Sequence, residues 1–182
     1  MKLSKVMLAL VVTFGLGGCE TLVTQRYSVT GDNNLAVKAL GVTAIGVGEF
    51  NGPSNFDSNC RALGPVQVAD GITHTQYIRK AFEEEFKIAG VFAANSPRVT
   101  LTGTVTRLEF SSTRAVTGGS WDIDLTLMSS NGSNMKVTEH YEFPSGFMAP
   151  TACKQTAEAF APAVQNLVGK IVRSTEFRAL VR

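Results

Sequence analysis

The chain from residue 98 to residue 143 alternates apolar and polar side chains with a period of two, which is typical of β-strands with one face in a core. The alternation changes phase after Val105, and this change predicts a β-bulge near Thr106 and Arg107. The two strands that follow should form a hairpin at Asn131 and Gly132. Their apolar rows are Trp121, Ile123, Leu125 and Leu127 in the first strand, and Met135, Val137, Tyr141 and Phe143 in the second.

Matching the two apolar rows also predicts the register of this hairpin. A two-residue turn would place Trp121 opposite Glu142, whereas a three-residue turn over 130–132 places it opposite Tyr141. Because a slip of one residue moves every side chain to the other face, the match favours the three-residue turn. Glu139 is then the one polar side chain in the second apolar row. We expect it to be exposed at the edge of the sheet, and the alternative is a buried functional carboxylate.

A helix is predicted directly before these strands. Thr73 and Gln76 have the spacing of a capping box, and Gly90 is suited to end a helix. We expect His74 on the surface of the first turn, and the three glutamates at 83–85 on the solvated face. The expected apolar stripe consists of Ile78, Ala81, Phe82, Ile88 and Ala89.

The order of elements predicts the fold class. Residues 40–50 are apolar at both odd and even positions, as in a strand buried on both faces. Residues 151–173 have the apolar spacing of a helix, and we expect Pro162 to kink or divide it. The order β-α-β-β-β-α predicts an α+β two-layer sandwich, in which a four-stranded mixed sheet carries two helices on one face. The helical crossover makes the first two strands parallel. The loops after the first and fourth strands therefore leave from the same edge of the sheet.

The N-terminus has the features of a secretory signal. Two lysines precede an apolar run over 6–16, which is too short to cross a bilayer, and small residues follow. The sequence Leu-Gly-Gly-Cys ending at Cys19 resembles the lipobox of bacterial lipoproteins. That resemblance implies a signal peptide over 1–18 and acylation of Cys19, while Glu20 resembles the pattern that directs such proteins to the outer membrane, on its periplasmic face. The alternative is an ordinary signal peptide with Cys19 as a structural thiol.

The rest of the chain divides into a tether and one domain. Residues 19–38 are polar and mixed, and we expect them to form a lipidated tether that reaches about 65 Å when extended. Residues 39–182 then form a single periplasmic α+β domain. Loss of 1–18 removes two lysines and leaves fifteen basic and fifteen acidic residues. A neutral chain has no basic footprint for nucleic acid, so we expect membrane contact through the acyl chains and no nucleic-acid partner.

Two cysteines are left once Cys19 carries the lipid. Cys60 and Cys153 are expected to pair, because the periplasm is oxidising. The predicted topology supports this pairing, since one cysteine lies in the loop after the first strand and the other just after the fourth. The alternative is a zinc site with His74 and His140, but these residues lack the spacing of zinc ligands. We therefore expect no metal and no cofactor.

The sequence contains no catalytic motif, and we expect the protein not to be an enzyme. Asp122 opposite His140 could orient a base, but we expect an exposed cross-strand pair. The candidate site is the edge that carries the disulfide. Its two loops hold apolar residues whose spacing fits neither a strand nor a helix facing the core. We expect these residues to bind a partner, and the alternative is that they cap the core. These residues are Phe56, Leu63, Phe147 and Met148.

The element order over 40–173 resembles that of small outer-membrane lipoproteins, such as the lipopolysaccharide-assembly lipoproteins that plug a β-barrel partner. We therefore expect a non-catalytic accessory or assembly factor that binds another protein of the cell envelope. A second hypothesis is a carrier or sensor of a small apolar or lipidic ligand, held between the sheet and the helices. Tight packing would disfavour the cavity that this second hypothesis needs. The residues concerned are Trp121, Phe82, Phe160 and Leu167.

Overall fold

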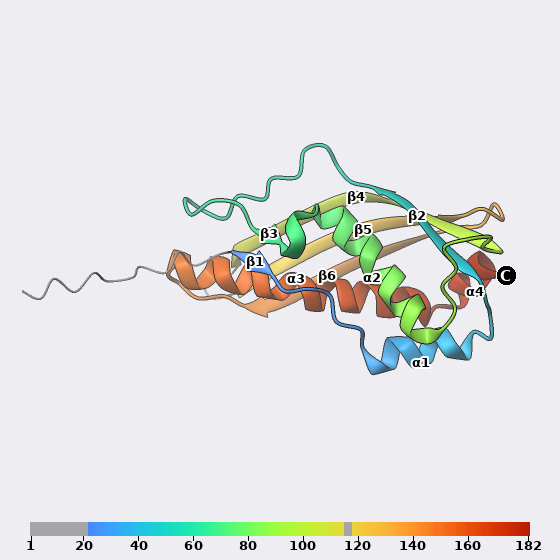
Figure 1. Cartoon of the computed structure of the whole chain (residues 1–182). Coiled ribbons are helices and arrows are strands. Elements are labelled where there is room, and N and C mark those ends of the chain that lie inside the picture. Colours follow the sequence, from blue (N-terminus) through green and yellow to red (C-terminus); the bar gives the residue numbers. More distant parts are fainter. Residues whose placement is uncertain (1–21, 115–117) are drawn as a thin grey trace, which may run out of the picture.

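A computed structural model describes residues 22–114 and 118–182 (Figure 1). The predicted signal peptide, Cys19 and Glu20 lie outside the described residues. The elements are, in chain order, β1 (Val23–Thr24), α1 (Gly31–Ala39), β2 (Ile45–Asn51), β3 (Gln67–Val68), a 3-10 turn η1 (Ala69–Gly71), α2 (His74–Ala89), β4 (Val99–Arg114), β5 (Gly118–Ser129), β6 (Asn134–Pro144), α3 (Ala149–Val172) and α4 (Thr175–Val181).

The main sheet confirms the predicted α+β class and topology. Its order is β2-β4-β5-β6, with β2 parallel to β4 and the other neighbours antiparallel. Trp121 lies opposite Tyr141, so the register that the apolar rows favoured is confirmed. The pairing of β4 with β5 shifts between Val105 and Arg107, where the bulge was expected.

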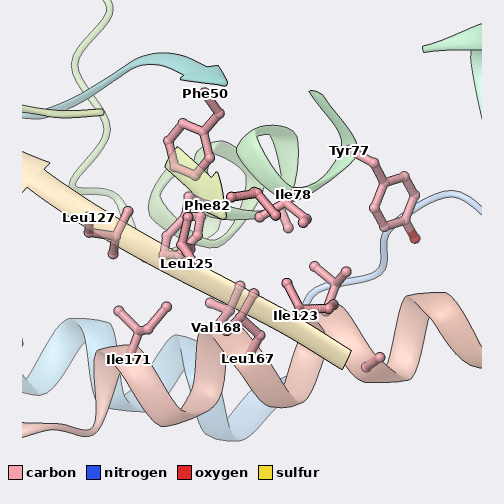
Figure 2. Packing of buried hydrophobic residues seen from close by; sticks show 14 of the residues in the cluster. Phe50, Tyr77, Ile78, Phe82, Ile123, Leu125, Leu127, Leu167, Val168 and Ile171 are labelled. Carbon is pink, nitrogen blue, oxygen red and sulfur yellow. The ribbon is translucent and has the colours of Figure 1, made fainter. Parts of the chain in front are cut away.

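Helices α2 and α3 cover the inner face of this sheet, α2 against β2 and α3 mainly against β5 and β6. Figure 2 shows side chains of both helices converging on the apolar row of β5. The capping box at Thr73 and Gln76 is present, and Gly90 ends α2 with a φ of 77° in the left-handed region. One expected stripe residue is wrong, because Ile88 is 57% exposed. The buried stripe of α2 consists of Tyr77, Ile78, Ala81, Phe82, Glu85 and Phe86.

The described part of the expected tether belongs to the folded domain, which corrects the prediction for 19–38. β1 pairs in parallel with β3, and α1 packs against α2 and α3 with Val37 fully buried. Residues 31–34 form the first turn of α1, because the Thr30 hydroxyl accepts a hydrogen bond from the Asn33 backbone N–H at 3.3 Å and caps the helix. We call residues 22–39 the N-terminal segment.

Two further boundaries differ from the prediction. The first main strand starts at Ile45 rather than residue 40. α3 runs through Pro162 as one helix of 24 residues, so it is not divided in two. Both halves of α3 bury side chains in the core, and this packing holds the helix together across the position that lacks a backbone N–H.

Candidate functional site

The predicted disulfide joins the loop after β2 to the first turns of α3. Cys60 and Cys153 are bonded, with their Cα atoms 5.7 Å apart and both residues fully buried. The bond fixes a long loop against the end of the domain where α3 begins. The two loops that we predicted to share an edge of the sheet therefore meet there.

Three of the four residues predicted to bind a partner are exposed at this end. Phe147 is 75% exposed, Met148 65% and Leu63 47%. Phe56 differs, because its ring packs 4.9 Å from that of His74 and is partly buried against the core. The alternative, in which these residues cap the core, thus holds for Phe56 alone. We call Leu63, Phe147 and Met148 the end patch.

Polar contacts to the backbone hold the end patch in place. Arg61 donates to the carbonyl of Phe147 at 2.9 Å and to the carbonyl of Ser112 at 2.7 Å, so it ties the two loops to β4. The Ser145 hydroxyl donates to the same Ser112 carbonyl at 2.8 Å. The backbone N–H of Gly146 donates to the side chain of Gln155 on α3 at 2.6 Å. The apolar side chains are thereby displayed on a fixed backbone and do not fold back into the core.

His74 lies in the core and not on the surface, which corrects the prediction. It is 8% exposed, and its ring lies 4.9 Å from that of Phe160 and 5.9 Å from that of Trp121. Burial lowers the pKa of His74 to about 4. The imidazole is therefore neutral at physiological pH and acts as part of an aromatic cluster.

Glu85 is also buried, although we expected it on the solvated face of α2. It is 0% exposed, and one carboxylate oxygen accepts three hydrogen bonds from the N-terminal segment. The donors are the Tyr27 hydroxyl at 2.8 Å, the Thr30 backbone N–H at 3.2 Å and the Asn33 side-chain amide at 3.3 Å. Burial raises the pKa of Glu85, and these hydrogen bonds offset part of that rise. The missed signal was its spacing, since Glu85 continues the stripe of Ile78 and Phe82.

The group around Glu85 extends to the end of α3. Arg173 donates to the side-chain oxygen of Asn33 at 2.9 Å, and the amide of Asn33 also donates to the carbonyl of Gln165 at 3.0 Å. Burial and the neighbouring Glu85 carboxylate raise the pKa of Tyr27, so its hydroxyl stays a donor. The N-terminal segment is thus tied to both α2 and α3 by buried polar contacts.

Glu139 and the predicted pair of Asp122 and His140 have different environments. Glu139 is 2% exposed, not exposed at an edge, because Lys170 of α3 covers it with its ammonium group 2.6 Å from the carboxylate. His140 and Asp122 are 2.7 Å apart on the outer face of the sheet, with the His140 side chain 43% exposed. They form the expected exposed cross-strand pair. Within 22–114 and 118–182, no cluster of three or more His, Cys, Asp or Glu side chains could hold a metal ion.

Comparisons with known proteins give a fold and no family. No family model matches the chain, and neither does any curated protein. A crystal structure of a Xanthomonas campestris protein of family DUF330 superposes with a TM-score of 0.51 at 19% identity, over 75% of this chain and 85% of that one. A Caulobacter crescentus structure described as a candidate lipoprotein has a TM-score of 0.41 at 12% identity, over 77% and 89% of the two chains. The first similarity shows a shared fold, and the second is too weak to add to it.

Proposed function

We propose that the chain is a lipid-anchored accessory protein of the bacterial envelope, attached through Cys19 to the outer membrane with its domain in the periplasm. It acts by binding another envelope protein and not by catalysis. The lipobox supports the anchor. The observation that carries the accessory role is how closely the domain follows the anchor, since Leu22 already belongs to the fold. None of the helices that the structure describes is long and apolar enough to cross a bilayer itself.

The contacts of the N-terminal segment begin at the first described residue. Leu22 is 9% exposed, and its carbonyl accepts a hydrogen bond from the backbone N–H of Gln67 at 2.8 Å. The Thr24 hydroxyl donates to the carbonyl of Ala157 in α3 at 2.8 Å. Three residue steps separate Cys19 from Leu22, and they span at most about 11 Å. The domain is therefore held beside its anchor. The expected tether would instead have allowed a distance of up to about 65 Å between them.

A short link suits an accessory protein better than a carrier. A domain at a fixed place by the membrane keeps a constant geometry toward an envelope complex, whereas a carrier needs reach to move its ligand. The core also disfavours an internal ligand site, because Trp121 and Phe160 are both 0% exposed with their rings 4.6 Å apart. Phe82 and Leu167 are likewise 0% exposed.

In-cell crosslinking of the lipidated protein, followed by purification in mild detergent and mass spectrometry, tests this proposal. We expect recovery of a stoichiometric envelope protein. A flexible Gly-Ser insertion of about 20 residues after Glu20 adds roughly 25 Å of mean reach and should reduce that recovery. The matched control carries the same insertion after Arg182, at the other end of the chain. Recovery of the chain alone, or with bound lipid, contradicts the accessory role and favours the carrier.

A further inference from the structure

The N-terminal segment runs along α3 in a known direction. Thr24 contacts the carbonyl of Ala157, and four residues later the carbonyl of Ser28 accepts a hydrogen bond from the side chain of Gln165 at 2.7 Å. Four residues of the segment thus pass eight residues of α3, or about 12 Å of helix. This is an extended path that leads toward the C-terminus of α3 (Figure 1). From Thr24 back to Leu22, the described segment therefore runs toward the N-terminus of α3, where the end patch lies.

The length of chain before Thr24 matches the distance to the end patch. Nine helical residues separate Met148 from Ala157, which is about 14 Å along α3. Cys19 is five residues before Thr24, and five extended residues span about 16–18 Å. The chain before Thr24 is therefore long enough for Cys19 to reach the level of Met148. This length allows the lipid anchor and the end patch to share one end of the domain.

Exposed apolar side chains concentrate at this end. Leu63, Phe147 and Met148 form the end patch, and Val23 of β1, which is 36% exposed, follows close to the anchor. The other large apolar side chains exposed on the described residues lie on other elements, Leu35 on α1, Ile88 on α2 and Met128 on β5. Arg61 beside the patch is a cation that suits an anionic headgroup region.

We infer that the end patch lies in the lipid–water interface of the membrane that holds the acyl chains, with Phe147 and Met148 inserted among the upper acyl chains. This inference rests on the proposed lipidation of Cys19. We assign the patch to the bilayer and not to a protein because the short link from Cys19 keeps the patch close to the membrane surface. The acyl chains supply the affinity, since a neutral chain adds little electrostatic attraction. The patch supplies the orientation, because it determines which end of the domain faces the lipid.

Tryptophan quenching by brominated lipid tests the inference on the full lipidated chain. The protein is reconstituted into vesicles of phosphatidylethanolamine and phosphatidylglycerol whose acyl chains are brominated near the headgroup. Phe147→Trp places the probe in the patch, and Leu35→Trp is the matched control. Asn33, beside Leu35, contacts Gln165 of α3, seventeen residues or about 25 Å along the helix from Met148. Both positions are well exposed, so neither variant disturbs the core, and Trp121, which is 0% exposed, is a constant background.

We expect the emission of Phe147→Trp to shift to the blue and to be largely quenched, and that of Leu35→Trp to be unaffected. Equal quenching of the two variants, or none in either, overturns the inference. A third outcome also overturns it: Phe147→Trp is not quenched in lipid vesicles, and its emission shifts to the blue only in native membranes. That outcome assigns the patch to a protein partner. Intact mass reports acylation separately, so an unlipidated chain refutes the anchor, whereas a lipidated chain without quenching refutes the position of the patch alone.

Discussion

Replacing Glu85 with alanine is expected to lower the free energy of unfolding by about 2–6 kcal/mol. The carboxylate is the acceptor for the Tyr27 hydroxyl and the Thr30 backbone N–H, and each loses its described partner in the variant. The amide of Asn33 keeps its bond to Gln165. Each buried donor left unpaired destabilises a protein by about 1–3 kcal/mol, which gives the stated range for two donors, and because Tyr27 and Thr30 are only half-buried we expect the lower part of it. Glu84→Ala, one residue away on the more exposed side of α2, should change stability by less than about 0.5 kcal/mol.

Glu85→Gln separates the charge from the hydrogen bonds. Glutamine keeps an acceptor for all three donors, and the carboxylate oxygen that it replaces with an amide group accepts no hydrogen bond from the described residues. Burial raises the pKa of Glu85 above its ordinary value of 4.5, so the folded state binds more protons than the unfolded state in the window above pH 4.5. Stability from this group is therefore lost as pH rises through that window. The glutamine variant lacks this contribution.

Urea denaturation followed by the fluorescence of Trp121 measures both effects. The free energy of unfolding is compared for wild type, Glu85→Ala, Glu85→Gln and Glu84→Ala across the window above pH 4.5. We expect the difference between wild type and Glu85→Gln to change with pH and to level off above the raised pKa. Equal losses in Glu85→Ala and Glu84→Ala, or a wild-type minus glutamine difference that is constant with pH, would refute the reasoning.

Three further predictions concern other buried contacts. Cys60→Ser with Cys153→Ser should lower the free energy of unfolding by up to about 4–5 kcal/mol, because the bond closes a loop of 93 residues; urea denaturation with and without reductant checks this, and equal stability in both contradicts it. The contribution of His74 to stability should fall by about 3 kcal/mol as pH drops from 6.5 to about 4, because unfolded His74 protonates in that window while the folded imidazole stays neutral. The difference in unfolding free energy between wild type and His74→Phe, measured by urea denaturation, should change by this amount across the window, and a difference that is constant with pH argues against it. Lys170→Ala should destabilise the domain by about 1–3 kcal/mol by leaving Glu139 buried without its cation, and Glu139→Gln in the same chain should restore part of the loss.

The elements that the sequence predicted well are those whose neighbours in space are also neighbours along the chain. The β5–β6 hairpin is one such case, because matching its two apolar rows leaves one register. The limits of α2 are another, since the capping box and Gly90 act within one turn of each end. The disulfide is an exception, since its cysteines are 93 residues apart, and it followed from topology because the direction of each strand determines which loops share an edge.

The predictions that failed depend on contacts between distant segments. α1 has mixed polarity, and three of its residues are buried only because α2 and α3 pack against it. His74 has a polar side chain at the start of a helix, and only the rings of Phe160 and Trp121 show that it belongs to the core. Glu85 and Glu139 occupy apolar positions in their own elements. Their partners Tyr27 and Lys170 lie 58 and 31 residues away, too far for a local pattern to reveal.

The burial of Glu85 has a consequence for the anchor. β1 pairs with β3 over only two residues, which is too short to hold a segment by itself. The stretch from Thr24 to Thr30 is fixed at one end by Ala157 and at the other by Glu85. Without the carboxylate the segment keeps the short strand and its hydrogen bonds to α3 at Thr24, Ser28 and Asn33, so fewer contacts hold it. In molecules in which these contacts also open, the link to Cys19 lengthens from about 11 Å toward about 65 Å. Glu85→Ala should therefore reduce the lipid quenching of Phe147→Trp in chains whose Trp121 signal shows a folded core, whereas Glu84→Ala should leave that quenching unchanged.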